Sequence, residues 1–147
     1  MSKPCISFNM KDAMEAWRHL RQGMEPMIRY GDRFEGKDLH TWDAGERILG
    51  RCNICGGFVL WQESEFHGAE DDDSYYSDFF PVTGSEEAEA INRRWDGWEI
   101  EDYFPERYLV QDNNNAPHWT WGLKRDGGSG SKEDQTENVA DTEKRGD

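Results

Sequence analysis

A Cys-x-x-Cys-Gly-Gly turn at residues 52–57 is the feature that most constrains how this chain can fold. Residues 47–51 precede the turn and residues 58–66 follow it, and both stretches mix apolar with polar side chains. Two such stretches around a glycine-containing bend are typical of a β-hairpin. Phe58 and Leu60 are two positions apart, so they share one face of their strand. The pattern therefore predicts a hairpin with the cysteines at its bend and one buried face.

The spacing of Cys52 and Cys55 is also that of a metal-ligand pair. Two thiolates on a tight bend can bind one tetrahedral zinc ion, and glycines allow backbone amides to approach the sulfur atoms. The turn resembles the knuckle of a zinc ribbon. A closed zinc site needs four ligands, and the chain has no second Cys-x-x-Cys pair. We consider four residues for the missing positions, with His40 and His67 as the candidates nearest the hairpin: Cys5, His40, His67 and His118.

Two other interpretations of the cysteine turn stay open. In the first, Cys52 and Cys55 are reduced residues at a bend whose aromatic core needs no metal. In the second, they form a redox pair of the thioredoxin type. That motif lies at the start of a helix, whereas residues 56–61 (GGFVLW) continue as a strand. The redox pair is therefore the weaker hypothesis.

Two helices are predicted outside the hairpin. Residues 9–23 carry apolar side chains at helical spacing, with Asn9 as the N-cap and Gly23 at the end. Residues 83–95 begin with a capping box formed by Thr83 and Glu86 and end with two arginines, which suits the helix dipole. Short aromatic strands are predicted at residues 98–104, 107–111 and 118–122, whereas residues 67–78 are too charged for a core strand.

These elements predict an α+β fold with two helices and a small, mostly antiparallel sheet that contains the zinc-knuckle-like hairpin turn. Residues 1–123 form one domain. Residues 124–147 combine glycine, serine and charged residues with almost nothing to bury, which predicts a disordered tail. No segment approaches the roughly 20 apolar residues of a membrane span. With an odd number of cysteines and no signal-peptide pattern, the sequence favours a cytoplasmic protein with reduced thiols.

The negative charge is concentrated in one part of the chain. The net charge is −14, and residues 63–112 hold sixteen acidic residues against three basic ones. Such a block repels nucleic acid and anionic membranes, because both are bound chiefly through lysine and arginine. The charge therefore predicts a basic protein as partner, with no direct binding of nucleic acid or membrane.

Aromatic residues are interleaved with the acids in this block. Carboxylates on a rigid surface can imitate phosphates and engage arginine clusters, while tyrosines supply anchoring area. The expected partner is a nucleic-acid-binding protein or a nuclease, held by nucleic-acid mimicry. The first candidates for binding are Glu70, Asp71, Asp72, Asp73, Tyr75, Tyr76 and Asp78; Glu99, Glu101 and Asp102 are secondary. In the alternative interpretation, the aromatics face inward and the acids are ordinary solvent-exposed surface.

Residues 50–102 resemble small acidic proteins carried by bacterial phages and mobile elements. The resemblance rests on CNICGG, LWQESEFHG, DDDSYYSDFFPV and EEAEAIN. The class of such proteins includes anti-CRISPR and anti-restriction inhibitors, so the resemblance implies a role in countering host defence. It carries no catalytic or binding residues.

No catalytic motif is visible in the chain. It lacks a phosphate loop, a His-Glu-x-x-His motif and an evident nucleophile–base arrangement. The sequence therefore predicts a non-enzymatic inhibitor of a basic, nucleic-acid-handling protein. The alternative is a zinc-knuckle structural or adaptor protein that mediates protein–protein interaction. A third hypothesis is a carboxylate-dependent enzyme using a pair such as Glu63 and Glu65, which share one strand face.

Overall fold

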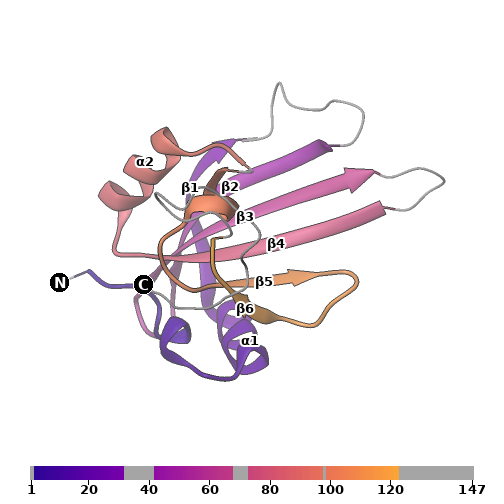
Figure 1. Ribbon diagram of the computed structural model, residues 1–147. Helices are drawn as coiled ribbons and strands as arrows, with labels where there is room; N and C mark the ends of the chain where they lie inside the picture. Colours follow the sequence, from indigo (N-terminus) through magenta and orange to yellow (C-terminus); the bar gives the residue numbers. More distant parts are fainter. Residues whose placement is uncertain (1, 32–41, 68–72, 98, 123–147) are drawn as a thin grey trace.

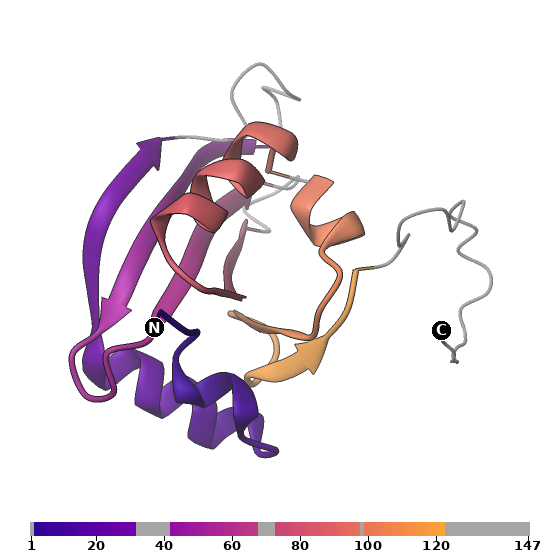
Figure 2. The same cartoon turned by 90° about the vertical axis from the view of Figure 1, so that its left-hand side faces the viewer.

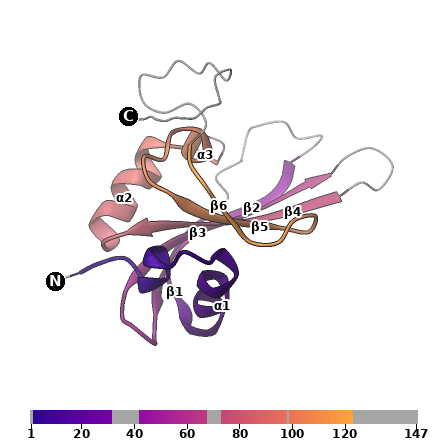
Figure 3. The same ribbon diagram turned by 60° about the horizontal axis from the view of Figure 1, so that its bottom comes forward.

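The computed structural model describes residues 2–31, 42–67, 73–97 and 99–122. Its centre is a six-stranded antiparallel sheet in which the spatial order of the strands is their order in the chain. Helices cover both faces, as Figures 1 and 3 show. The predicted α+β class is confirmed. The predicted tail at residues 124–147 lies outside the described residues.

The elements have the following bounds. The helices are the 3₁₀-helix η1 (Ile6–Asn9), α1 (Ala13–Gly23), α2 (Ser85–Arg94) and α3 (Glu99–Tyr103). The strands are β1 (Met24–Gly31), β2 (Trp42–Cys52), β3 (Phe58–His67), β4 (Asp73–Val82), β5 (Tyr108–Asp112) and β6 (His118–Thr120). Among the described residues, none of the helices has the length and apolar character needed to span a membrane.

The predicted hairpin around the cysteines is confirmed. β2 and β3 pair in antiparallel register from Arg51 opposite Phe58 to Trp42 opposite Phe66. The bend is closed by backbone hydrogen bonds from Cys52 N to Gly57 O (2.8 Å) and from Gly56 N to Cys52 O (2.7 Å). Gly56 has a φ of +79°, a conformation that glycine adopts without strain. Both cysteines therefore lie at the closed end of the β2–β3 hairpin.

Helix α1 begins later than the sequence predicts. Its N-cap is Asp12, whose side chain accepts a hydrogen bond from Met14 N (3.1 Å), so the prediction of Asn9 as the cap is wrong. Asn9 is instead the last residue of η1. Asparagine and aspartate are both preferred N-cap residues, so the residue types alone did not distinguish position 9 from position 12. Gly23 ends the helix as predicted.

The charged segment that was not expected to form a strand contributes β4, which lies between β3 and β5. Phe80 and Val82 point to one face of this strand and Phe79 to the other, and all three are buried. Charge did not prevent strand formation, because the acidic residues precede an apolar run that pairs with β3 along its whole length. The prediction that residues 67–78 are too charged for a core strand is therefore wrong for residues 73–78.

Helices α2 and α3 lie on the same face of the sheet, as Figure 2 shows. The Glu87 carboxylate, rather than that of Glu86, accepts from Thr83 N (2.7 Å) and from the Thr83 hydroxyl (3.0 Å). At α3, Asp96 Oδ1 accepts from Glu99 N (3.1 Å) and Glu99 Oε1 accepts from Asp96 N (3.0 Å). This reciprocal capping box starts a helix, so the prediction of a strand at residues 98–104 is wrong.

The sheet separates two hydrophobic cores. On the face of α2 and α3, Leu49, Leu60 and Phe80 pack with residues of both helices. On the face of α1 and η1, Val59, Phe79 and further apolar residues pack against α1, and Cys5 and Cys52 belong to this second core. The sulfur atoms therefore sit at the boundary between a helix, the N-terminal segment and the hairpin bend.

Candidate metal centre

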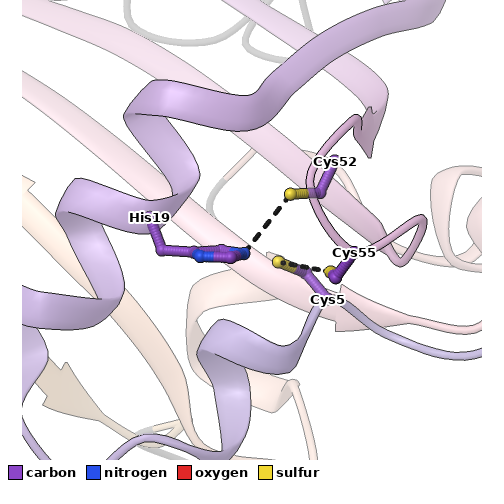
Figure 4. Close-up of side chains that lie close together, drawn as sticks. All are labelled: Cys5, His19, Cys52 and Cys55. Carbon is purple, nitrogen blue, oxygen red and sulfur yellow. Dashed lines mark hydrogen bonds between the residues drawn. The ribbon is translucent and has the colours of Figure 1, made fainter.

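Four side chains from three separate segments converge at the hairpin bend. Cys5 precedes η1, His19 belongs to α1, Cys52 ends β2, and Cys55 lies in the bend itself. The Sγ atoms and one imidazole nitrogen all lie within 4.8 Å of one another. Figure 4 shows the His19 ring directed toward the three sulfur atoms. Among the described residues, these four side chains form the group of His, Cys, Asp or Glu residues that is close enough to hold a metal ion.

The distances fit a tetrahedral metal shell. Cys5 Sγ lies 3.7 Å from Cys55 Sγ, and Cys52 Sγ lies 3.3 Å from His19 Nε2. A tetrahedral ion with metal–sulfur bonds of about 2.3 Å and metal–nitrogen bonds of about 2.0 Å separates two sulfurs by about 3.8 Å and sulfur from nitrogen by about 3.5 Å. These two distances therefore match a four-coordinate ion held by three thiolates and one imidazole, and the remaining ligand atoms lie within 4.8 Å of one another.

The backbone holds Cys5 against the hairpin. Cys5 N donates to Phe58 O (2.9 Å), and Phe58 N donates to Lys3 O (3.0 Å). Pro4 and Phe58 form an isolated parallel bridge at the same place. A Cβ atom at Gly57 would lie 2.5 Å from Cys5 Cα and 2.6 Å from Pro4 O. The close approach of the N-terminal segment therefore requires glycine at position 57.

Helix α1 reaches the centre through its last two turns. Ala16 and Leu20 are fully buried, and His19 lies on the flank of the same helical face. At the end of α1, a Cβ at Gly23 would lie 2.7 Å from Cys52 Sγ, and Gly23 O accepts from Asn53 N (2.7 Å). The end of the helix is thus packed directly on the bend that carries the cysteines.

The environments of the thiols differ strongly. Burial raises the pKa of Cys5 to about 12, and the neighbouring Cys52 adds to the effect. Burial alone would also raise the pKa of Cys55, but hydrogen bonds from the Ile6 backbone, the His19 side chain and the Gly57 backbone lower it to about 6. Backbone amides directed at a sulfur atom stabilise a thiolate, which is the form that ligates metal.

The predicted ligands divide into three groups. Cys52 and Cys55 belong to the cluster, and so does Cys5, which was one of four further candidates. His40 lies outside the described residues. His118 does not belong to the cluster. His67 ends β3, about 30 Å of extended strand away from Phe58 at the bend, so it does not ligate here and that prediction is wrong. His118 is on β6 and contacts Ala116 O (3.0 Å).

His19 was missed in the sequence because it is remote from the cysteine turn. It is 33 positions from Cys52, and its neighbours in α1 were counted only as a hydrophobic stripe. The available signal is its position three residues after the buried Ala16, which puts it beside the core-facing stripe. A histidine beside a buried helical face is a candidate ligand once cysteines are expected at that face.

The predicted acidic surface is only partly described. Glu70, Asp71 and Asp72 lie outside the described residues, and Asp73 begins β4. Tyr75 is 51% exposed and Glu99 is exposed. Tyr76, Glu101 and Asp102 are partly buried. Asp78 is only 2% exposed, because it points to the inner face of β4 beneath α3, so its predicted role at a surface is wrong.

An acidic strand surface, defined here as Glu46, Glu63, Glu65 and Tyr75, lies on the α1 side of the sheet. Glu46 is opposite Glu63 on β2 and β3, and Glu65 is opposite Tyr75 on β3 and β4. Arg29 Nη1 forms an ion pair with Glu46 Oε2 (2.7 Å). The surface is at the end of the hairpin away from the cysteines, where β2–β4 extend past the helices in Figure 1. It is spatially separate from the candidate metal centre.

Comparison of the chain with protein-family models, with curated proteins and with solved structures found no match.

Proposed function

We propose that the protein is a zinc-stabilised structural or adaptor module, in which one zinc ion fastens the N-terminal segment and α1 to the β2–β3 hairpin. The observation that carries this proposal is the convergence of Cys5, His19, Cys52 and Cys55 within 4.8 Å. Three soft thiolates and one imidazole favour zinc over magnesium or calcium, which prefer oxygen ligands. A shell of four protein ligands is typical of structural zinc, since a catalytic ion keeps an open position.

The centre presents two exposed apolar residues at the surface. Ile6 follows Cys5 and is 37% exposed, and Ile54 lies between Cys52 and Cys55 and is 54% exposed. A bound ion would fix the two segments that carry these side chains relative to each other. Exposed apolar side chains on rigid backbone are the kind of anchor that protein interfaces use. The zinc ion would therefore stabilise a protein-binding end of the molecule.

Metal content tests the proposal directly. Protein purified without chelator is expected to contain one zinc ion per chain, and cobalt(II) in its place should give the absorption bands of a tetrahedral thiolate site. His19→Ala should lower zinc affinity by at least about 100-fold, by analogy with removal of a structural ligand. The matched control His118→Ala should retain the ion. Substoichiometric zinc, together with a thermal midpoint unchanged by EDTA, would refute the proposal.

A second candidate function is inhibition of a basic, nucleic-acid-handling protein of the anti-CRISPR or anti-restriction kind. The acidic strand surface favours it, because Glu63 and Tyr75 expose a carboxylate and an aromatic ring on one face of adjacent strands. Rows of carboxylates beside aromatic anchors suit binding to an arginine- and lysine-rich groove.

Charge reversal distinguishes this second candidate. Glu63→Lys with Glu65→Lys should abolish capture of basic host proteins, and capture by the wild type should weaken steeply with salt. Glu86→Lys with Glu89→Lys makes the same change in net charge on α2, which covers the other face of the sheet, and should leave capture intact. If both double variants lose capture equally, only net charge matters and the acidic strand surface is not the binding site.

A further inference from the structure

The two sulfur atoms of Cys5 and Cys55 are close enough to be joined by a modest movement. Their Sγ atoms lie 3.7 Å apart, although the residues are 50 positions apart in the chain. A disulfide has an S–S length of about 2.05 Å, so the sulfurs must approach by about 1.7 Å. Side-chain rotation supplies most of such a movement when the backbone segments already lie side by side. The backbone hydrogen bonds between Cys5 and Phe58 provide that arrangement.

The exposure of the three thiols gives them different access to an oxidant in solution. Cys5 is 1% exposed and Cys52 is fully buried, whereas Cys55 is partly exposed at the bend. Cys52 Sγ lies 3.3 Å from His19 Nε2, on the helix side of the cluster. An oxidant therefore reaches Cys55 first, and Cys5 Sγ is the buried sulfur within 3.7 Å that can react with the oxidised product.

We propose that Cys55 and Cys5 form an oxidation site, with Cys55 as the sulfur that reacts with a hydroperoxide and Cys5 as the resolving thiol. The inference rests on the proposed function, because it concerns regulation of the same centre. Disulfide formation removes two of the four ligands, which leaves Cys52 and His19 and releases the zinc ion. The product is a form in which the N-terminal segment is covalently tied to the hairpin bend.

The chemistry balances with hydrogen peroxide as the oxidant. The Cys55 thiolate attacks one peroxide oxygen, the O–O bond breaks, Cys55 becomes a sulfenic acid, and the departing hydroxide takes up a proton to become water. The Cys5 thiol then attacks the Cys55 sulfur and gives its proton to the departing hydroxide, so that the S–S bond forms, the S–O bond breaks and a second water leaves. One thiolate and one thiol lose two electrons in total, and one peroxide is reduced to two waters with one proton consumed.

The inference selects one pairing among three. A Cys-x-x-Cys motif ordinarily suggests a bond between its own two cysteines, here Cys52 and Cys55. In this bend, Cys52 N and Cys52 O are both held by Gly57 and Gly56, and its sulfur is in contact with the His19 ring. The structure instead places Cys5 Sγ against Cys55 Sγ. Oxidation should therefore link the N-terminal segment to the bend and leave the Cys52 thiol free.

The experiment treats the full-length protein, with and without bound zinc, with one equivalent of hydrogen peroxide. Zinc release is followed with a chromogenic chelator, and the disulfide is mapped by mass spectrometry of unreduced peptides. The expected product is a Cys5–Cys55 cross-linked peptide, formed together with zinc release and reversed by dithiothreitol. In Cys5→Ser, Cys55 should stop at the sulfenic acid, which dimedone traps; in Cys52→Ser, the Cys5–Cys55 link should still form.

The two proposals can fail separately. Zinc content before oxidation tests the structural zinc ion, whereas the mapped pairing tests the oxidation site even on metal-free protein. A Cys52–Cys55 link as the main product, or three thiols that survive the peroxide, would overturn the inference. Circular dichroism of each variant before oxidation establishes that it is folded, and the unsubstituted chain carries the decisive mapping in any case.

Discussion

Residue 57 determines how closely the N-terminal segment approaches the hairpin bend. The site where its Cβ would be lies against backbone atoms of Pro4 and Cys5, which cannot move aside as a flexible side chain can. Gly56, its neighbour, has a different requirement, since it has a φ of +79° while its Cβ position meets only the Arg51 guanidinium, at an ordinary contact distance of 3.7 Å. Position 57 therefore requires glycine because of a close contact with backbone atoms, whereas position 56 requires it because of its backbone conformation.

Gly57→Ala is expected to lower the free energy of unfolding by about 1–3 kcal/mol through overpacking and to weaken zinc binding by displacing Cys5. Gly56→Ala is expected to cost about 1–2 kcal/mol through its left-handed backbone while zinc binding stays close to that of the wild type. Urea unfolding and competitive zinc titration measure the two effects. Equal zinc affinity in both variants would show that the position of Cys5 does not depend on residue 57.

The carboxyl groups of Asp78, which is buried, and of Glu101, which is partly buried, form a second unusual set of residues. Burial is the main cause that raises the pKa of Asp78, to about 6; a hydrogen bond from Glu101 lowers it and the charge of Asp112 raises it. Burial and the nearby Asp78 raise the pKa of Glu101 well above its usual value. The Arg47 charge opposes the shift at both groups. The folded protein therefore holds protons that the unfolded chain releases near pH 4.

The sign of the pH effect follows from this proton retention. The contribution of the pair to stability is largest below about pH 4 and falls as the pH rises toward about 6 for Asp78 and higher for Glu101. Glu101→Gln should flatten the decrease in the free energy of unfolding from about pH 4 to about pH 7. Glu63→Gln, an exposed control on β3, should follow the wild-type profile. Parallel profiles for all three proteins would contradict the prediction.

At the residue scale, the sequence indicated which side chains could bind a metal ion more readily than it indicated which side chains are buried and what they contact. The Cys52 and Cys55 spacing was sufficient to predict two members of the candidate metal centre. The inward direction of Asp78 depends on the register of β4 between β3 and β5, and a run of acids gives no such register. The partnership of His19 with the cysteines depends on the packing of α1 on the bend, which involves residues 33 positions apart.

Among the elements, the connection between α2 and α3 depends on one buried arginine of β2. Arg47 is fully buried, and its Nη1 donates to Trp95 O (2.8 Å) while Nη2 donates to Asp96 O (3.0 Å). Nε and Nη2 donate to Gln62 Oε1 at 3.0 and 2.7 Å. Gln62 Nε2 in turn donates to Gly97 O (2.9 Å). The central strands thus hold the start of α3 through a continuous hydrogen-bond network.

Arg47→Lys is expected to lower the free energy of unfolding by about 3–5 kcal/mol, because an ammonium group cannot satisfy this set of acceptors in a buried site. Arg29→Lys is the matched control, since Arg29 forms a surface ion pair with Glu46 and should cost less than about 1 kcal/mol. Urea unfolding gives the energies, and hydrogen exchange at α3 should increase selectively in Arg47→Lys. A cost for Arg47→Lys as small as that of the control would contradict this role.

Element prediction succeeded where a local signal was unambiguous. The glycine-containing bend located the β2–β3 hairpin, and the acids and arginines of residues 83–95 located α2. It failed where two signals competed. In α3, aromatic residues favoured a strand, but the Asp96–Glu99 capping box determined a helix. In β4, charge favoured a loop, but pairing along two neighbouring strands determined a strand.

For the whole molecule, the α+β class followed from the sequence, but the arrangement of layers did not. The cysteine turn gave no indication that Cys5 and α1 would meet there, since these contacts join segments 33 to 50 positions apart. The candidate metal centre and the acidic strand surface lie at opposite ends of the β2–β3 hairpin. A metal-dependent function and a charge-dependent function can therefore be separated by mutation.

Removal of zinc is expected to destabilise the molecule without unfolding it, because both hydrophobic cores lie largely outside the ligand set. With free zinc at a few hundred times its dissociation constant, the zinc-bound form should be about 3–4 kcal/mol more stable than the form in EDTA. Thermal unfolding with and without EDTA measures the difference, while far-ultraviolet circular dichroism should stay similar. An unfolded metal-free chain would show that the cores are insufficient alone.

The consecutive order of the six strands has a consequence for folding kinetics. Every strand pair joins neighbours in the chain, so most of the sheet can form from local pairings at low loop-closure cost; β4 and β5 are the pair that α2 and α3 separate. The contacts of Cys5 with the hairpin bend join residues about 50 positions apart and should form after the folding barrier is crossed. In stopped-flow experiments, zinc is therefore expected to slow unfolding and to leave the refolding rate almost unchanged. Zinc-accelerated refolding would place closure of the N-terminal segment in the folding nucleus.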